Sequence, residues 1–98
     1  MKQKEYSVYI VVNDYGALYI GVTSQLVRRI CAHRYLVGSQ YTKKYSMSKC
    51  VFVETYDNPL QAIAREKQLK KWSRKKKIWL IEMQNPTWRD LYYDMIAL

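Results

Sequence analysis

Two short apolar segments at the start of the chain, joined by a turn, constrain its fold more than any other feature. Residues 5–12 (EYSVYIVV) and 17–22 (ALYIGV) alternate between two rows of side chains, as strands of a sheet do. The intervening NDYG favours a turn, so the segments predict an antiparallel hairpin. One apolar row of this hairpin contains Val8, Ile10, Val12, Leu18, Ile20 and Val22.

The opposite row brings two tyrosines together. A three-residue turn at 13–15 places Tyr9 directly across from Tyr19. A shift of the register by two residues keeps the two side chains on one face as diagonal neighbours. A shift by one would separate them and mix the apolar rows. We therefore expect Tyr9 and Tyr19 to lie on the same face of the hairpin.

The rest of the chain predicts one more strand and several helices. Thr23 or Ser24 is suited to cap a helix that runs to about Tyr35. KCVFVETY (49–56) has high strand propensity. Helices are predicted for residues 59–72, for 73–85 and, in a short form, after Pro86. The sequence thus predicts an α+β fold in one domain (1–98), with a core over about 5–85 and a helical extension over 86–98.

Charge and composition point to a polyanionic partner. The chain carries 17 Lys+Arg against 8 Asp+Glu, a net charge of +9, which is typical of nucleic-acid-binding domains. Its two cysteines and single histidine have no zinc-site spacing. The apolar run near the N-terminus is too short for a signal peptide, and no stretch approaches the length of a membrane span. We expect a cytoplasmic protein that binds nucleic acid and no membrane.

Glu66 is the acidic residue that most needs an explanation. It lies between Ala62 and Leu69 on the apolar stripe of its predicted helix, and residues 65–77 include eight Lys or Arg. A carboxylate that faces inward needs an arginine or a metal ion as its partner. The alternative is an ordinary salt bridge to Lys70, one turn along the helix.

Two further polar residues, Arg29 and His33, lie on the apolar stripe of the helix after the hairpin, together with Leu26 and Ile30. Arg29 is either an arginine at the rim of the core or a phosphate clamp, for which its planar donors are suited. His33 is either a packed histidine or a catalytic one. Each residue alone is a weak indication, but together with the tyrosines and Glu66 they indicate a site.

These residues resemble the GIY-YIG nuclease family. SVY (7–9) and YIG (19–21) lie where the two name-giving elements of that family lie, although Ser7-Val8 replaces Gly-Ile. The family has an arginine ten residues after the second tyrosine, as Arg29 is here, and a histidine or tyrosine four residues further on, as His33 is. It also has a metal-binding glutamate on the helix after the third strand, which matches Glu66. The TKKY and REKQLKKW segments are similar to those of small, stand-alone bacterial members.

The resemblance implies a three-stranded antiparallel sheet flanked by helices and metal-dependent hydrolysis of DNA phosphodiester bonds. Tyr9 would be the general base, with its pKa lowered by nearby positive charge, and Tyr19 would orient the water or a phosphate oxygen. Arg29 would stabilise charge on the transition state, with His33 as an auxiliary hydrogen-bonding group or proton relay. Glu66 would hold Mg²⁺ or Mn²⁺, with no small-molecule cofactor.

The small Gly21 in the second strand would allow a backbone or a substrate to approach closely. Many members of the family also place an asparagine near the metal, after the glutamate helix. Asn85 is the late candidate in this chain, and the sequence gives it no clear role.

Basic residues in two segments are candidates for contact with the DNA backbone, which would position DNA without reading its sequence. They are Lys43, Lys44, Lys67, Lys70, Lys71 and Arg74. A solvated basic helix face is the alternative. A DNA-binding module that cuts little or not at all, and a basic interaction protein with vestigial site residues, are the alternatives to an endonuclease. The sequence leaves open the DNA structure, DNA versus RNA, and the oligomeric state.

Overall fold

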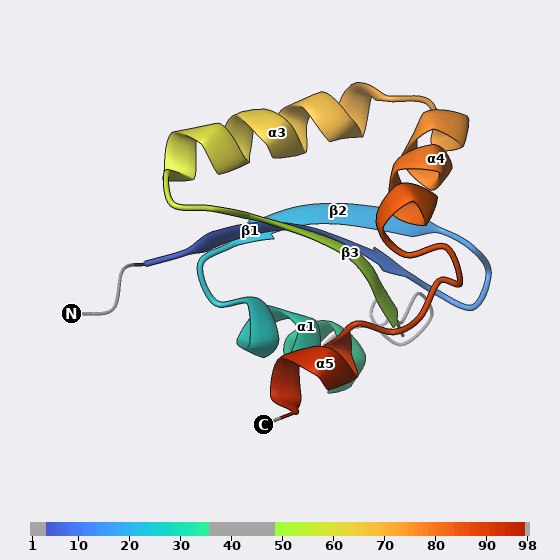
Figure 1. The fold of residues 1–98 in the computed structure, drawn as a ribbon, viewed down its shortest axis with the longest axis horizontal. Coiled ribbons are helices and arrows are strands. Elements are labelled where there is room, and N and C mark those ends of the chain that lie inside the picture. Colours follow the sequence, from blue (N-terminus) through green and yellow to red (C-terminus); the bar gives the residue numbers. More distant parts are fainter. Residues whose placement is uncertain (1–3, 36–48, 98) are drawn as a thin grey trace.

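The computed structural model describes residues 4–35 and 49–97, which form a three-stranded sheet with helices on both faces (Figure 1). The strands are β1 (Tyr6–Val12), β2 (Leu18–Thr23) and β3 (Lys49–Tyr56), in the order β2-β1-β3, and both pairings are antiparallel. The predicted α+β fold and its strand–strand–helix–strand–helix order are confirmed.

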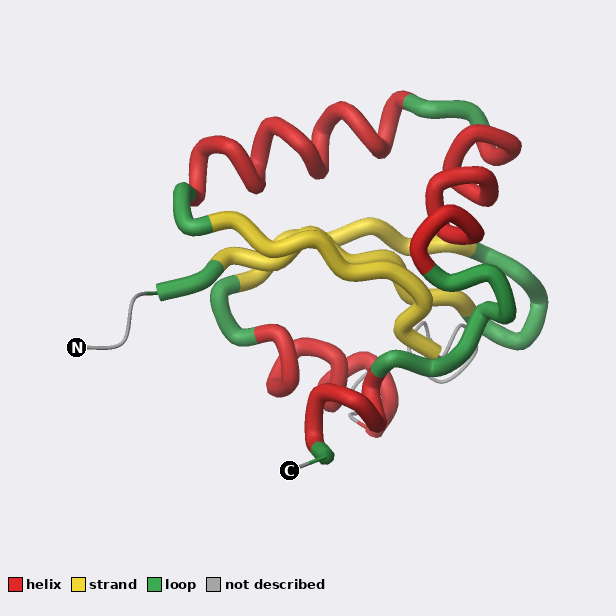
Figure 2. Tube along the Cα trace, in the orientation of Figure 1, coloured by secondary structure: helices red, strands yellow, loops and turns green. Residues whose placement is uncertain are grey.

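The helices divide between the two faces of the sheet (Figures 1 and 2). Helices α3 (Pro59–Lys71) and α4 (Arg74–Gln84) lie on one side. Helix α1 (Leu26–Tyr35) and the short α5 (Tyr92–Ile96) lie side by side on the other. We call these the α3 face and the α1 face. Among the described residues, no helix has the length and apolarity that a membrane crossing needs.

Local hydrogen bonds start the helices close to where the sequence predicts. The Asn58 side chain accepts hydrogen bonds from the backbone N–H of Leu60 (2.8 Å) and Gln61 (3.3 Å), and Pro59 occupies the first turn of α3. Ser73 caps α4 in the same way, accepting from the backbone N–H of Lys76 (3.2 Å). These caps satisfy backbone donors that lack a partner within the helix.

Strand β1 supplies side chains to two separate cores because its residues alternate between the faces. On the α3 face its apolar row packs against buried side chains of α3 and α4; this core includes Val8, Ile10, Val12, Phe52, Ala62, Leu69 and Ile81. On the α1 face, Tyr9 and Val11 pack with Ile30, Cys50 and Tyr92. The buried residues of the α3-face core are all apolar, whereas those of the α1-face core include two phenols, Tyr9 and Tyr92.

The chain after α4 covers the outer edge of β3. The Gln84 side chain donates to the carbonyl of Val53 (2.8 Å) and accepts from its N–H (3.0 Å), as a neighbouring strand would. The Asn85 side chain is buried and donates to the carbonyl of Val51 (3.1 Å). Further along, the N–H of Leu91 donates to the carbonyl of Cys50 (2.8 Å). Asn85, whose role the sequence leaves open, thus helps to seal a strand edge that would otherwise expose unpaired groups.

Candidate active site

The hydroxyl of Tyr9 is the centre of a polar cluster on the α1 face. Its ring is buried (1% exposed). Arg29 Nε donates a hydrogen bond to the Tyr9 oxygen at 3.2 Å, and His33 Nε2 lies 3.1 Å from the same oxygen. Both partners come from α1, one turn apart. Because Arg29 and His33 are four residues apart on one side of α1, both side chains reach the hydroxyl oxygen of Tyr9 in β1.

Tyr19 forms the outer side of this cluster. Its ring centroid lies 5.1 Å from that of His33 and 6.4 Å from that of Tyr9. It is 36% exposed, whereas Tyr9 is buried. The four predicted catalytic residues are therefore grouped, and Tyr19 is the most exposed aromatic ring among them.

The strand register is shifted by two residues from that of a three-residue turn, and the prediction that Tyr9 and Tyr19 share one face is confirmed. Tyr9 pairs with Gly21, and Tyr19 pairs with Val11, so the two tyrosines are diagonal neighbours on one face. The loop spans residues 13–17 because the Asn13 side chain accepts hydrogen bonds from the backbone N–H of Tyr15 (3.0 Å) and Ala17 (2.8 Å). A five-residue loop moves the pairing by two residues relative to a three-residue turn, and the shared face is kept.

The register explains Gly21. A Cβ at this position would overlap the Cζ and hydroxyl oxygen of Tyr9, so the glycine makes room for the tyrosine ring that faces it across the strands. The sequence predicts a close approach at Gly21, and the group that approaches is a side chain of the same protein.

The protein surroundings alone do not give Tyr9 the lowered pKa that the resemblance implies. Burial raises the pKa of the Tyr9 phenol; the hydrogen bond and positive charge of Arg29 oppose this rise without reversing it. Burial, and next the charge of Arg29, lower the pKa of His33 below its usual 6.5. At neutral pH the cluster therefore holds a neutral phenol beside a neutral imidazole, with Arg29 as the charged member.

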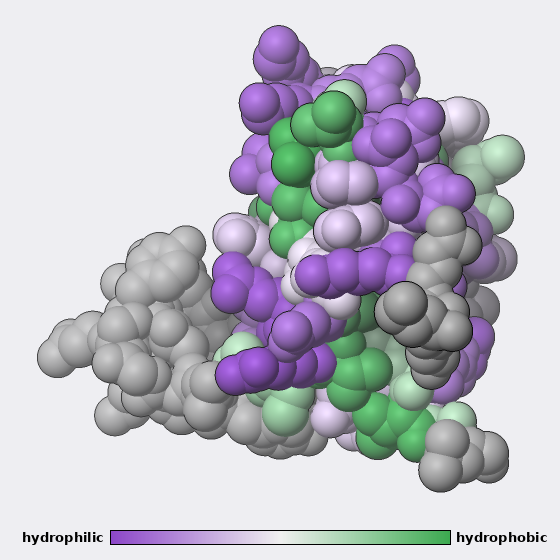
Figure 3. Space-filling view, turned by 90° about the vertical axis from the view of Figure 1, so that its left-hand side faces the viewer, coloured by the Kyte–Doolittle hydropathy of each residue, from purple (hydrophilic) through white to green (hydrophobic). Residues whose placement is uncertain are grey.

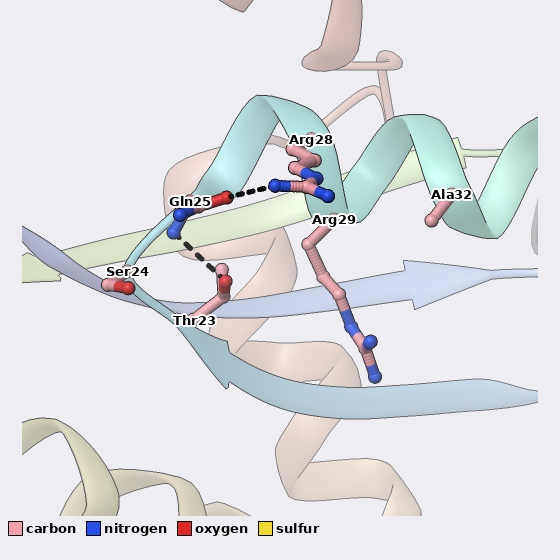
Figure 4. Close-up of a pocket in the computed structure, with 6 residues that line it drawn as sticks. All are labelled: Thr23, Ser24, Gln25, Arg28, Arg29 and Ala32. Atoms are coloured by element: carbon pink, nitrogen blue, oxygen red, sulfur yellow. Dashed lines mark hydrogen bonds between the residues drawn. The ribbon is translucent and has the colours of Figure 1, made fainter.

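A cavity of about 250 Å³ opens beside this cluster, at the junction of β2 and α1. The residues that line it are Thr23, Ser24, Gln25, Arg28, Arg29 and Ala32 (Figure 4). No pattern in the sequence marks Arg28 as a site residue, although it directly precedes Arg29 and follows Gln25 by three residues. Its guanidinium donates to the Gln25 side chain at 3.2 Å.

Glu66 lies apart from the tyrosine cluster. It belongs to α3, on the other face of the sheet, and forms an ion pair with Lys70 at 3.4 Å. Its side chain is 16% exposed, so the carboxylate is partly buried, as its position on the stripe predicts. Arg65, on one flank of that stripe, reaches Glu54 of β3 at 2.9 Å. Glu66 is on the other flank, from which we infer that its side chain leans toward β2, the opposite edge strand.

The metal site is the least complete part of the predicted arrangement. Within residues 4–35 and 49–97, no group of three or more His, Cys, Asp or Glu side chains could hold a metal ion. In the same part of the chain, no hydrogen bond or ion pair connects Glu66 to Tyr9, Arg29 or His33. The Lys70 pair is the alternative that the spacing already offered.

The predicted DNA-contacting residues lie mostly on the α3 side. Lys67, Lys70 and Lys71 are exposed on α3, and Arg74 begins α4. The Arg74 guanidinium donates to the Gly16 carbonyl at 2.7 Å, which ties α4 to the hairpin loop. Hydrophilic residues cover most of the upper part of the end view in Figure 3, which includes the α3 side of the molecule. Lys43 and Lys44 lie outside the described residues.

Comparison with known families now gives the class of protein. Residues 5–78 match the model of the GIY-YIG catalytic domain, and the chain belongs to this family. The match includes the cluster around Tyr9 and also Glu66. The family resemblance seen in the sequence is confirmed.

Individual relatives are small proteins of similar length. UPF0213 protein SSP2268 of Staphylococcus saprophyticus is 36% identical over 74 residues, which is 76% of this chain and 90% of the relative. UPF0213 protein CPE1444 of Clostridium perfringens is 36% identical over 78 residues, or 80% and 84% of the two chains. The solution NMR structure of UPF0213 protein BH0048 from Bacillus halodurans matches with a TM-score of 0.59 and 27% identity, covering 88% of this chain and 92% of that one.

Proposed function

We propose that this protein is an endonuclease that hydrolyses phosphodiester bonds in DNA with the help of a divalent metal ion. The observation that carries the proposal is the Tyr9 hydroxyl, which accepts a hydrogen bond from Arg29 (3.2 Å) and lies 3.1 Å from His33 Nε2. A buried phenol between a cation and a neutral imidazole is suited to move a proton. Membership of the GIY-YIG family supports the same reaction.

The charges favour a relay in which Tyr9 never becomes a free phenolate. The attacking water gives a proton to the Tyr9 oxygen while the Tyr9 hydroxyl gives its own proton to His33 Nε2. This requires the His33 tautomer with its proton on Nδ1, and the lowered pKa of His33 keeps the ring neutral before the reaction. The water oxygen forms a bond to phosphorus, the bond to the leaving oxygen breaks, and the leaving oxygen takes a proton from solvent.

Arg29 has two roles in this scheme. Its Nε–H holds the Tyr9 oxygen, its guanidinium also bonds to Tyr19, and an N–H group that neither tyrosine occupies would bind a phosphate oxygen that gains charge in the transition state. Tyr19 is the exposed phenol of the cluster and would orient the water or a phosphate oxygen. Removal of one such charge-stabilising donor typically costs about 10²–10³ in rate.

Glu66 would hold Mg²⁺ or Mn²⁺. Mg²⁺ in phosphoryl-transfer sites is commonly bound through one or two carboxylates, with water and substrate phosphate as its other ligands, so a single partly buried carboxylate suits it. Lys70 would have to leave Glu66 for the ion to bind. When bound, the ion would neutralise charge on the leaving oxygen. Because Glu66 leans toward β2, the DNA would lie along that edge, between the lysines of α3 and the tyrosine cluster.

One observation favours a second candidate, a DNA-binding module that does not cut. The Glu66–Lys70 ion pair neutralises the carboxylate without any metal, as a pure binding protein would require near phosphates. In that case the basic residues of α3 would bind the DNA backbone, and the Tyr9 cluster would only stabilise the fold.

Cleavage assays would test the proposal. The purified protein would be incubated with labelled linear, nicked and branched DNA in Mg²⁺, in Mn²⁺ and in EDTA, beside Tyr9→Phe and Glu66→Gln variants. Glu5→Gln, which removes an exposed carboxylate, is the matched control for charge. We expect metal-dependent cleavage that both site variants lose and the control keeps. Salt-sensitive binding with no cleavage of any substrate would support the binding module instead.

A further inference from the structure

The cavity beside the tyrosine cluster has the chemistry of an anion site. Two of its six lining residues are arginines, three others carry hydroxyl or amide groups, and none is acidic. Arg29 belongs to both the cavity and the cluster around Tyr9. In Figure 4 the Arg28 side chain points back toward Gln25, whereas the Arg29 side chain points toward the sheet. The cavity thus extends the positive charge of the reaction site outward from Arg29.

Arg28 is held in place without being neutralised. Its Nη1 donates to the Gln25 Oε1 at 3.2 Å, and among the described residues no salt bridge involves it. The Gln25 backbone N–H in turn donates to the Thr23 hydroxyl at 3.0 Å. A guanidinium oriented by a neutral amide keeps its full charge and its other donors for a ligand.

We propose that this cavity, defined by Arg28, Arg29, Gln25, Thr23, Ser24 and Ala32, binds the phosphate group next to the one that is cleaved. The proposal rests on the proposed function, because Arg29 is taken to contact the scissile phosphate. Phosphates follow each other along one strand at about 3.4 Å of helix axis, so a strand held at Arg29 carries another phosphate close by. Arg28 would bind that phosphate and fix which bond lies at Tyr9.

Titration with inorganic phosphate tests the cavity without any cleavage. Amide chemical shifts would be recorded for the wild type, for Arg28→Gln and for Lys75→Gln, which removes one exposed positive charge on α4. We expect saturable shifts at Ser24, Gln25 and Arg28 in the wild type and the control, with at least tenfold weaker binding in Arg28→Gln. An equal response to chloride at the same ionic strength, or an unchanged affinity in Arg28→Gln, would overturn the proposal.

A second pair of variants tests the cavity on DNA. Ala32→Glu and Ala32→Gln have side chains of nearly the same shape and differ in charge. We expect Ala32→Glu to weaken binding of a short duplex in EDTA by at least tenfold relative to Ala32→Gln, because its carboxylate would face the bound phosphate. Equal binding by the two variants would contradict the proposal.

Steady-state cleavage separates this proposal from the proposed function. If the wild type cuts DNA and Arg28→Gln raises KM while leaving kcat within about threefold, the result supports both the nuclease and the phosphate site. If the wild type cuts and Arg28→Gln changes neither constant, the phosphate site is wrong and the nuclease stands. If the wild type cuts nothing while inorganic phosphate still binds through Arg28, the nuclease fails and the cavity remains an anion site.

Discussion

The two faces of the sheet are built from the same strands and carry opposite chemistry. On the α3 face, the side chains of β1 are apolar and meet apolar residues of α3, so burial itself stabilises the contact. On the α1 face, β1 presents Tyr9, whose buried hydroxyl requires the polar partners Arg29 and His33. The comparison indicates that one face provides most of the stability and the other carries the groups of the proposed reaction, so substitutions should separate the two.

The largest expected effect is on the α3 face. Leu69 is fully buried there, and Leu69→Ala should lower the free energy of unfolding by about 2–5 kcal/mol, because it leaves a cavity in an apolar core. The cleavage rate constant kcat of the folded protein should stay within about twofold of the wild type. Urea denaturation and cleavage assays measure the two quantities. A large loss of rate in a fully folded sample would show that the faces are not separable.

The next effect is on the α1 face. In Gly21→Ala the new methyl group would occupy the space of the Tyr9 ring, so the hydroxyl must move away from Arg29 and His33. We expect kcat to fall about 10²-fold, as misplacement of a catalytic group by about 1 Å can do. Overpacking should also cost about 1–3 kcal/mol in the free energy of unfolding.

Val22→Ala is the control for Gly21→Ala. Val22 is the next residue of β2 and packs against the α3-face core. This variant should lose stability while keeping kcat, measured by the same two assays. Similar losses of kcat in both variants would mean that β2 as a whole, rather than the space for Tyr9, controls the rate.

The third effect is a pH dependence of the cleavage rate, which we expect from the protonation of His33 on the α1 face. The relay needs a neutral His33, so the rate should be level near pH 7 and fall about tenfold per unit as the pH drops below the lowered pKa of His33. Because an unfolded His33 binds a proton more readily than the folded one, the free energy of unfolding should fall as the pH drops from about 6.5, the unfolded value, to the lowered pKa of folded His33, and should then level off.

A pH–rate profile of His33→Gln would test the assignment of this acidic limb. The variant should be slower at neutral pH and should lack the limb, whereas Tyr19→Phe should keep it. If the limb persists in His33→Gln, another group accepts the proton.

Side-chain patterns along the sequence predicted the two faces, and with them the shared face of Tyr9 and Tyr19, but not the strand register or the burial of Tyr9. Alternation in β1 placed Tyr9 and Val8 on opposite faces, and helical spacing placed Arg29 and His33 together, because both patterns are local. The register depended on hydrogen bonds of the Asn13 side chain, and the Tyr9 pKa depended on how completely α1 covers the ring. Neither the strand register nor the shift of the Tyr9 pKa can be predicted from the periodicity of side chains.

Glu66 and Asn85 show the same limit for long-range contacts. The stripe on α3 predicted that Glu66 is partly buried, but its spacing allowed a metal or Lys70 equally. The Asn85 side chain bonds locally to the backbone of Arg89, but its contact with Val51, in a strand 34 residues earlier, has no signal in the local sequence. Contacts that depend on how α4 packs against β3 require the assembled sheet.

The smallest expected effect concerns Ser7, one of the two residues at which the chain departs from the family name. Ser7 stands where the family has glycine, is buried, and pairs with Thr23 and Thr55 in the neighbouring strands. It shares the α1 face with Tyr9. In Ser7→Gly, greater freedom of the unfolded chain should lower the free energy of unfolding by about 0.5–1 kcal/mol.

The rate of Ser7→Gly decides whether this departure matters for chemistry. No hydrogen bond connects Ser7 to Tyr9, Arg29 or His33 in the described part of the chain, so kcat and KM should stay within about twofold. A rise of tenfold or more in kcat, in an assay run beside wild type, would mean that the serine restrains the Tyr9 cluster. The reactive part of the α1 face would then extend one row further along the sheet, to the Thr23–Ser7–Thr55 row beside the phosphate cavity.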